Sequence, residues 1–108
     1  MVSFKQFSEI DLRVGIIVSV EELEGARKPL YKLKVDLGDM GFRNIAAGIK
    51  DRYSKEELLG KAIVVVANLD PKPVGSFVSE GMLLAAEDDH AVSIITVDRG
   101  LKPGSIVR

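Results

Sequence analysis

The chain has 108 residues and a mass of 11.7 kDa, which suits one domain and leaves no room for a second hydrophobic core. It has no cysteine and one histidine, so a disulfide framework, a thiolate metal site, a cysteine nucleophile and a two-histidine zinc site within one chain are excluded. No apolar run reaches the roughly 20 residues of a membrane span, and the first residues lack the apolar stretch of a signal peptide. We therefore expect a cytoplasmic protein with no membrane partner.

The net charge is −1, but the charges are unevenly distributed along the sequence. Residues 27–61 hold nine basic and five acidic side chains, whereas residues 1–26 and 62–108 are net acidic. The basic side chains of this segment are Arg27, Lys28, Lys32, Lys34, Arg43, Lys50, Arg52, Lys55 and Lys61. A local excess of this kind either attracts anions within a Debye length of about 10 Å or is ordinary solvated surface.

The first long element is a predicted strand over residues 12–20, which alternate strictly between two faces. The face expected to be buried consists of Leu12, Val14, Ile16, Val18 and Val20. Gly15 suggests a bend or bulge of the kind that closes a small barrel. A short helical or irregular lead-in precedes this strand and contains Phe4, Phe7 and Ile10.

A predicted hairpin follows. The inward positions of its first strand are Tyr31, Leu33, Val35 and Leu37. Lys32 and Lys34 point to the opposite face. A turn over residues 38–41 leads into a returning strand over residues 42–49.

The second half begins with a short helix, for which Ser54 and Glu57 form a capping box and which ends at Gly60. Residues 62–67 are a continuous apolar run, typical of a central strand buried on both faces. The further expected elements are an irregular, proline-containing loop over 68–75, strands over 82–86, 91–97 and 105–107, and a turn over 88–90.

This order of elements predicts an all-β protein, a small OB-fold barrel of five or more strands with one short helix between strands three and four. An open sandwich is the alternative, but it needs no helix at that point. The sequence contains no internal repeat or linker. We therefore expect a single domain over residues 1–108.

The sequence carries no phosphate-binding glycine loop and no nucleophile elbow, so we expect no enzymatic activity and no cofactor. The run Asp88, Asp89 and His90 could be interpreted as metal ligands, but neighbouring strand residues alternate faces, which favours a polar hairpin tip and no metal. Asn68 and Ser79 stand at the ends of predicted neighbouring strands. Such groups can contact base edges and ribose hydroxyls, or they can satisfy backbone groups in turns.

Four segments, in this order along the chain, resemble the tRNA-binding domain family: residues 11–15, 31–38, 65–69 and 79–86. This family includes the C-terminal domain of methionyl-tRNA synthetases, freestanding tRNA-binding proteins and CsaA-type export chaperones. The resemblance covers residues 4–108 and implies an OB-fold without catalytic activity that binds tRNA by shape and backbone contacts. The tRNA-binding positions that it implies are Arg27, Lys28, Lys32, Lys34, Asn68, Ser79, Glu80 and Met82.

Two branches of the family remain open. Residues 26–29 resemble the CsaA-type branch, whereas residues 68–69 and 79–82 resemble the tRNA-binding branch. We expect a tRNA-binding protein that serves as a trans-acting module for methionyl-tRNA synthetase. The alternative is an export chaperone that binds segments of unfolded preprotein in the same groove.

Freestanding members of the family are typically homodimers, and apolar residues outside the strand alternation predict such a contact here. The expected interface residues are Phe4, Phe7, Ile10, Val74, Phe77 and Val78. The alternative is that Phe4 and Phe7 plug the open end of the barrel.

Overall fold

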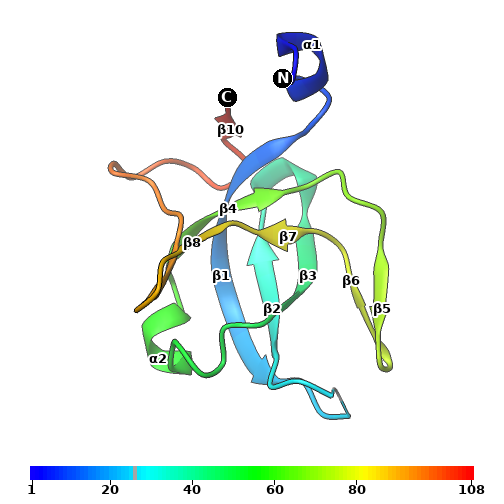
Figure 1. The fold of residues 1–108 in the computed structure, drawn as a ribbon, viewed down its shortest axis with the longest axis vertical. Coiled ribbons are helices and arrows are strands. Elements are labelled where there is room, and N and C mark those ends of the chain that lie inside the picture. Colours follow the sequence, from blue (N-terminus) through cyan, green and yellow to red (C-terminus); the bar gives the residue numbers. More distant parts are fainter. Residues whose placement is uncertain (26) are drawn as a thin grey trace.

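The computed structural model describes residues 1–25 and 27–108. Ala26, the first residue of the segment that resembles the CsaA-type branch, lies outside the described residues. The fold is a nearly closed antiparallel barrel, as expected, with strand order β3-β2-β1-β4-β7 (Figure 1). Its strands are β1 (Leu12–Glu22), β2 (Tyr31–Asp36), β3 (Phe42–Ala47), β4 (Ala62–Val66) and β7 (Met82–Leu83). The short helix α2 (Lys55–Leu58) connects β3 to β4, which confirms its expected position.

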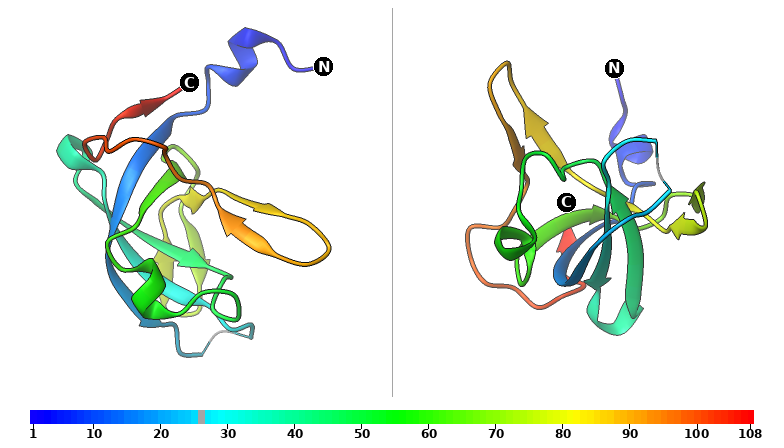
Figure 2. Two further views of the ribbon diagram at one scale, coloured as in Figure 1. Left: turned by 90° about the vertical axis from the view of Figure 1, so that its left-hand side faces the viewer. Right: turned by 90° about the horizontal axis from the view of Figure 1, so that it is seen from below.

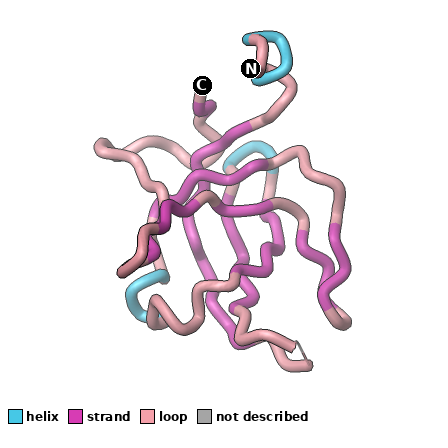
Figure 3. Tube along the Cα trace, in the orientation of Figure 1, coloured by secondary structure: helices cyan, strands magenta, loops and turns pink. Residues whose placement is uncertain are grey.

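Shorter helices and strands flank this barrel. They are α1 (Phe4–Phe7), the 3-10 turn η1 (Gly38–Met40), the hairpin of β5 (Lys72–Val74) and β6 (Phe77–Ser79), the hairpin of β8 (Ala85–Glu87) and β9 (Val92–Ile94), and β10 (Ile106–Val107). β10 pairs with the start of β1, so both ends of the chain lie at the same end of the barrel (Figure 2). The two hairpins extend on opposite sides of the barrel in the tube view (Figure 3).

Across the described ranges 1–25 and 27–108, no helix has the length and apolarity needed to cross a membrane.

The core forms largely where the alternation of the sequence places it. Tyr31 is almost completely buried, and Leu33, Val35 and Leu37 are fully buried, which confirms the inward set of β2. The central apolar run is confirmed as well, because residues 63–67 are all buried. The capping box of α2 is present, with the side chains of Ser54 and Glu57 each accepting a backbone N–H of the other residue.

The inward face of β1 was predicted only in part: Val14 is fully buried as expected, but residues assigned to the other face are buried as well. Ile17 is fully buried in the core, and the Cα of Gly15 faces Val35 and Leu37 across the barrel interior. Val18, which was expected inside, is 42% exposed. A register shift between Ile17 and Ser19 then reverses the phase, so Val20 packs against the core. Because apolar side chains occupy both faces of this strand, alternation alone could not identify the inward face.

Two other expectations also need correction. Residues 72–79, expected to begin as irregular loop, form the β5–β6 hairpin, in which Pro73 lies opposite Val78. Proline is tolerated there because β5 is an edge strand that pairs with β6 alone. The strand expected over 82–86 is divided at Leu84, whose N–H donates to Val64 O and whose carbonyl accepts from Ile95 N. At Leu84 the chain thus leaves the barrel sheet and enters the β8–β9 hairpin.

Gly15 offers a test of the barrel interior. A Cβ at this position would lie 2.5 Å from Val35 Cγ1 and 3.0 Å from Leu37 Cδ2, and both of these side chains are fully buried. We expect Gly15→Ala to lower the free energy of unfolding by about 1–3 kcal/mol, because overpacking forces the core to shift. Urea denaturation measures this loss. The control is Gly100→Ala, where an added Cβ meets nothing within 4 Å, and equal stability of both variants would contradict the expectation.

Candidate nucleic-acid interface

The barrel closes between β3 and residues 79–80, and side chains make most of this seam. Ser79 is 7% exposed, and its Oγ accepts the backbone N–H of Ala46 at 3.0 Å. The Glu80 carboxylate accepts the N–H of Asn44 at 3.0 Å, while the N–H of Glu80 donates to Asn44 O at 2.7 Å. Ser79 and Glu80 therefore replace part of a backbone ladder. For Ser79 these hydrogen bonds match the alternative in which the hydroxyl satisfies a backbone group. A contact of Ser79 with tRNA stays a prediction.

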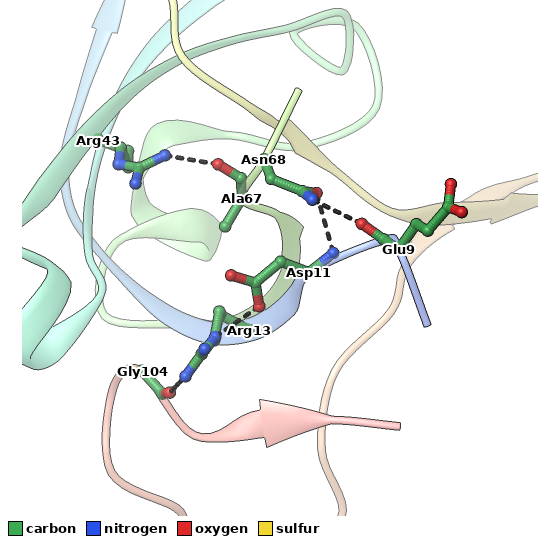
Figure 4. Close-up of polar contacts among 7 residues, drawn as sticks. All are labelled: Glu9, Asp11, Arg13, Arg43, Ala67, Asn68 and Gly104. Atoms are coloured by element: carbon green, nitrogen blue, oxygen red, sulfur yellow. Dashed lines mark hydrogen bonds and ion pairs between the residues drawn. The ribbon is translucent and has the colours of Figure 1, made fainter. Parts of the chain in front are cut away.

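Asn68 occupies a similar structural position at the end of β4. Its Oδ1 accepts the N–H of Asp11 at 2.9 Å, and its Nδ2 donates to Glu9 O at 2.7 Å (Figure 4). The Asn68 amide thereby joins the segment between α1 and β1 to the start of the excursion over residues 68–81. Asn68 as a tRNA contact also stays a prediction.

Arg43 holds both ends of that excursion. Its guanidinium donates to Ala67 O at 2.6 Å and to Glu80 O at 3.4 Å. Figure 4 shows the first of these bonds beside the Asn68 contacts. Arg43, one member of the basic segment, therefore uses its guanidinium to hold the β5–β6 hairpin against the barrel.

The two strand lysines lie together on the outer face of β2, beside a hollow of about 330 Å³. Lys32 Nζ is 3.3 Å from Glu21 Oε2 and 6.0 Å from the centroid of the Phe77 ring. Lys34 Nζ lies 4.6 Å from the centroid of the Phe42 ring. Each of these lysines thus lies over one aromatic ring, within the distance range of cation–π contacts.

A larger groove of about 630 Å³ lies between β3 and the β5–β6 hairpin. Its lining residues are Lys28, Leu30, Ala46, Leu69, Asp70, Lys72, Pro73, Val74, Ser79, Gly81 and Met82. Three of the implied tRNA-binding residues, Lys28, Ser79 and Met82, meet here. Arg27 lies in an adjoining hollow with Lys28 and Lys72. The structure therefore brings four of the implied positions together around the hairpin and places the strand lysines in a separate hollow, whereas Asn68 and Glu80 line none of these hollows.

Sequence reasoning missed three residues of this surface. Phe42 and Asn44 lie on β3, opposite Asp36 and Lys34 in the strand register, and Lys72 lies on the unexpected hairpin. Phe42 is exposed, and the available signal was an aromatic residue on the strand that follows the alternating lysines in the predicted hairpin.

The residues predicted for a dimer contact divide into two separate surfaces. Phe4, Phe7 and Ile10 line an apolar hollow of about 370 Å³ next to β10. Val74, Phe77 and Val78 instead lie on the β5–β6 hairpin. The alternative that Phe4 and Phe7 plug the barrel is wrong, because Phe4 is 85% and Phe7 is 42% exposed.

The acidic turn at residues 88–90 is a hairpin tip, as favoured from the sequence. Asp88 Oδ1 accepts the backbone N–H of His90 at 2.8 Å and of Ala91 at 2.9 Å. These two donors stabilise the carboxylate and lower the pKa of Asp88 below its ordinary value. Within residues 1–25 and 27–108, no group of three or more His, Asp or Glu side chains is placed to hold a metal ion.

A small barrel with polar groups on strands two and three and on the loop between strands four and five has the architecture of an OB-type binding domain. The family model described as "Putative tRNA binding domain" matches residues 12–106, and the chain belongs to this family. The methionine–tRNA ligase of Pyrococcus furiosus is 49% identical over 107 residues, which are 99% of this chain and 14% of the ligase. The chain therefore spans only a small part of the curated relatives it matches.

Solved structures resemble the whole chain. The CsaA chaperone protein from Picrophilus torridus superposes with a TM-score of 0.94 at 41% sequence identity. The match covers 100% of this chain and 100% of that chain. A MetRS-related protein from Pyrococcus horikoshii has a TM-score of 0.90 at 34% identity, with 100% of this chain and 98% of that chain covered. Both branches that the sequence resembles are thus represented among its structural relatives.

Ser79 tests the seam. We expect Ser79→Ala to lower the free energy of unfolding by about 1–3 kcal/mol, because it leaves the N–H of Ala46 without its partner in a largely buried place. Thermal or urea unfolding measures this change. Ser76→Ala, at an exposed position in the hairpin turn, is the matched control. A Ser79→Ala variant as stable as this control would show that the hydroxyl does not hold the seam.

Proposed function

We propose that this chain is a non-catalytic tRNA-binding protein that acts in the cytoplasm. The observation that carries the proposal is the collection of cationic side chains around the outer face of β2 and the β5–β6 hairpin. These side chains are Arg27, Lys28, Lys32, Lys34 and Lys72. OB folds bind nucleic acids with the face of strands two and three and with the loops at its edges, which is where these cations lie.

The chemistry of this surface favours contacts with the RNA backbone. Lysine ammonium groups bind phosphate as point charges and carry little sequence information. Part of the positive charge is compensated within the protein, since Glu21 pairs with Lys32 and Glu22 pairs with Lys50 at 3.2 Å. With a net charge of −1 for the whole chain, we expect modest affinity that falls steeply with salt.

The partner we propose is methionyl-tRNA synthetase. Curated relatives of this chain include methionine–tRNA ligases, in which the similar segment is 14–16% of the length. A synthetase that lacks such a segment would gain tRNA affinity from this chain bound in trans, because a second contact raises the effective concentration of the shared ligand.

A second candidate function is a CsaA-type chaperone that binds unfolded preprotein. The observation that favours it is the apolar part of the larger groove, which Leu30, Leu69, Val74 and Met82 line. An extended peptide could place alternate side chains in this groove. Parallel titrations with total tRNA and with an unfolded preprotein separate the two functions, and competition between the ligands would assign both to one groove.

We further propose a two-fold symmetric homodimer through the apolar surface of α1 and β10. Phe4, Phe7, Ile10 and Ile106 are exposed by 85%, 42%, 47% and 60%, and they border one hollow. A cluster of this kind is unusual on a small monomer, and a second copy of the same surface would cover it. Two copies would also present two basic faces to one tRNA.

Salt dependence tests the basic face. We expect Arg27→Ala and Lys32→Ala each to weaken tRNA binding and to lower the slope of log K against log salt by roughly 0.7–0.9, because each removes one phosphate contact. Fluorescence anisotropy over a salt series gives both values. Arg99→Ala, which removes an exposed charge outside this face, is the control. If neither slope changes, the tRNA binds elsewhere.

Light scattering tests the dimer. We expect the protein at micromolar concentration to have twice the mass of one 11.7 kDa chain, and Phe4→Ser to yield a folded monomer, because Phe4 is 85% exposed and outside the core. Leu59→Ser, which alters an exposed leucine after α2, should leave the dimer intact. A Phe4→Ser dimer would place the contact on another surface, and a wild-type monomer would refute the assembly.

A further inference from the structure

We propose that the hollow beside Lys32 and Lys34 is a binding site for one unpaired nucleotide of the RNA. The proposal rests on the tRNA-binding function above and deepens it, since it specifies which part of the RNA this surface recognises. The hollow lies between β1, β2, β3 and the β5–β6 hairpin. Its lining residues are Ser19, Glu21, Lys32, Leu33, Lys34, Asn44 and Phe77.

The size and walls of the hollow suit a single base. Its volume of about 330 Å³ lies at the lower end of the range for small-molecule pockets, which is about 300–1,000 Å³. Phe77 supplies an aromatic wall on the hairpin, and its ring is only partly buried. A base can stack on such a ring whatever its identity.

Asn44 supplies the group that can contact a base edge. Its backbone N–H and carbonyl are both used in the seam with Glu80, at 3.0 Å and 2.7 Å. Its exposed side-chain amide makes no hydrogen bond to any of residues 1–25 and 27–108. The seam therefore fixes the backbone of Asn44 and leaves a donor and an acceptor for a ligand.

Charged groups around the hollow suit the rest of a nucleotide. Lys34 Nζ, held 4.6 Å from the Phe42 ring centroid, and Lys32 Nζ can each contact a phosphate. The Glu21 carboxylate, 3.3 Å from Lys32, is an acceptor for a ribose hydroxyl, a group that DNA lacks at the 2′ position. Base, phosphate and sugar thus each find a complementary group among the side chains of one hollow.

Such a site discriminates between paired and unpaired nucleotides. In a duplex, each base is stacked between its neighbours and its Watson–Crick edge is occupied, so it cannot reach Phe77 and Asn44 together. An unpaired nucleotide at a loop or a chain end can. The lysines alone would bind both forms of RNA through phosphates.

The test compares two RNAs of equal length, a blunt duplex and a hairpin with a single-stranded 3′ overhang, by fluorescence anisotropy at one salt concentration. We expect wild type to bind the overhang RNA more tightly. Phe77→Leu, which keeps an apolar side chain without the aromatic face, should lower affinity for the overhang RNA about tenfold and leave duplex binding within about twofold. Asn44→Ala should act in the same direction and change the preference among the four bases at the overhang.

A control variant and the pattern of outcomes distinguish a failure of the nucleotide site from a failure of the proposed tRNA-binding function. Leu59→Ala, an exposed apolar truncation after α2, should bind both RNAs like wild type. If wild type binds neither RNA and no tRNA, the proposed function fails and the site with it. If wild type binds tRNA but shows no preference for the overhang, or if Phe77→Leu and Asn44→Ala weaken both RNAs equally, the nucleotide site alone is refuted. Should Phe77→Leu fail to fold, Asn44→Ala gives the same decision.

Discussion

The polar seam between β3 and residues 79–80 is the interaction on which the arrangement of this protein depends. A barrel strand normally meets its neighbour through a ladder of backbone hydrogen bonds, but here Ser79 Oγ and the Glu80 carboxylate accept N–H groups of β3. Because the β5–β6 hairpin ends at Ser79, the same bonds that close the barrel also determine where the hairpin stands. The larger groove and the smaller hollow lie on the surfaces that this hairpin shares with β2 and β3.

Much of the barrel could be predicted from the sequence, because in β2, β4 and α2 local pattern and tertiary environment agree. The alternation of β2 has polar residues on its outer face, so its inward set is unambiguous. In β1 the apolar Ile17 lies on the face opposite to the other apolar residues and a bulge changes the phase after it, and a periodic pattern does not locate such a bulge. The β5–β6 hairpin was missed because proline normally excludes a strand, and only the edge position of β5 makes Pro73 acceptable.

The candidate site could be predicted only in part, for a related reason. The lysines of β2 follow from alternation, but their aromatic neighbours come from β3 and β6, which only the folded chain brings to them. For Asn68 and Ser79 the sequence left two roles open, a nucleotide contact or a backbone contact, and their backbone partners lie 57 and 33 residues away along the chain. A polar residue at a strand end looks the same in sequence whether it faces a ligand or a distant backbone group.

The contacts of Arg43 bear on how the length and sequence of the β5–β6 hairpin can vary. Its guanidinium joins the carbonyls of Ala67 and Glu80, so the chain between them is a loop whose two ends are already held together. The entropic cost of closing a loop grows only with the logarithm of its length, about 0.6 kcal/mol for each doubling. Residues inserted between these anchors would therefore cost the barrel little conformational entropy. The hairpin can be lengthened or exchanged, and ligand preference altered, while the fold that carries it stays the same.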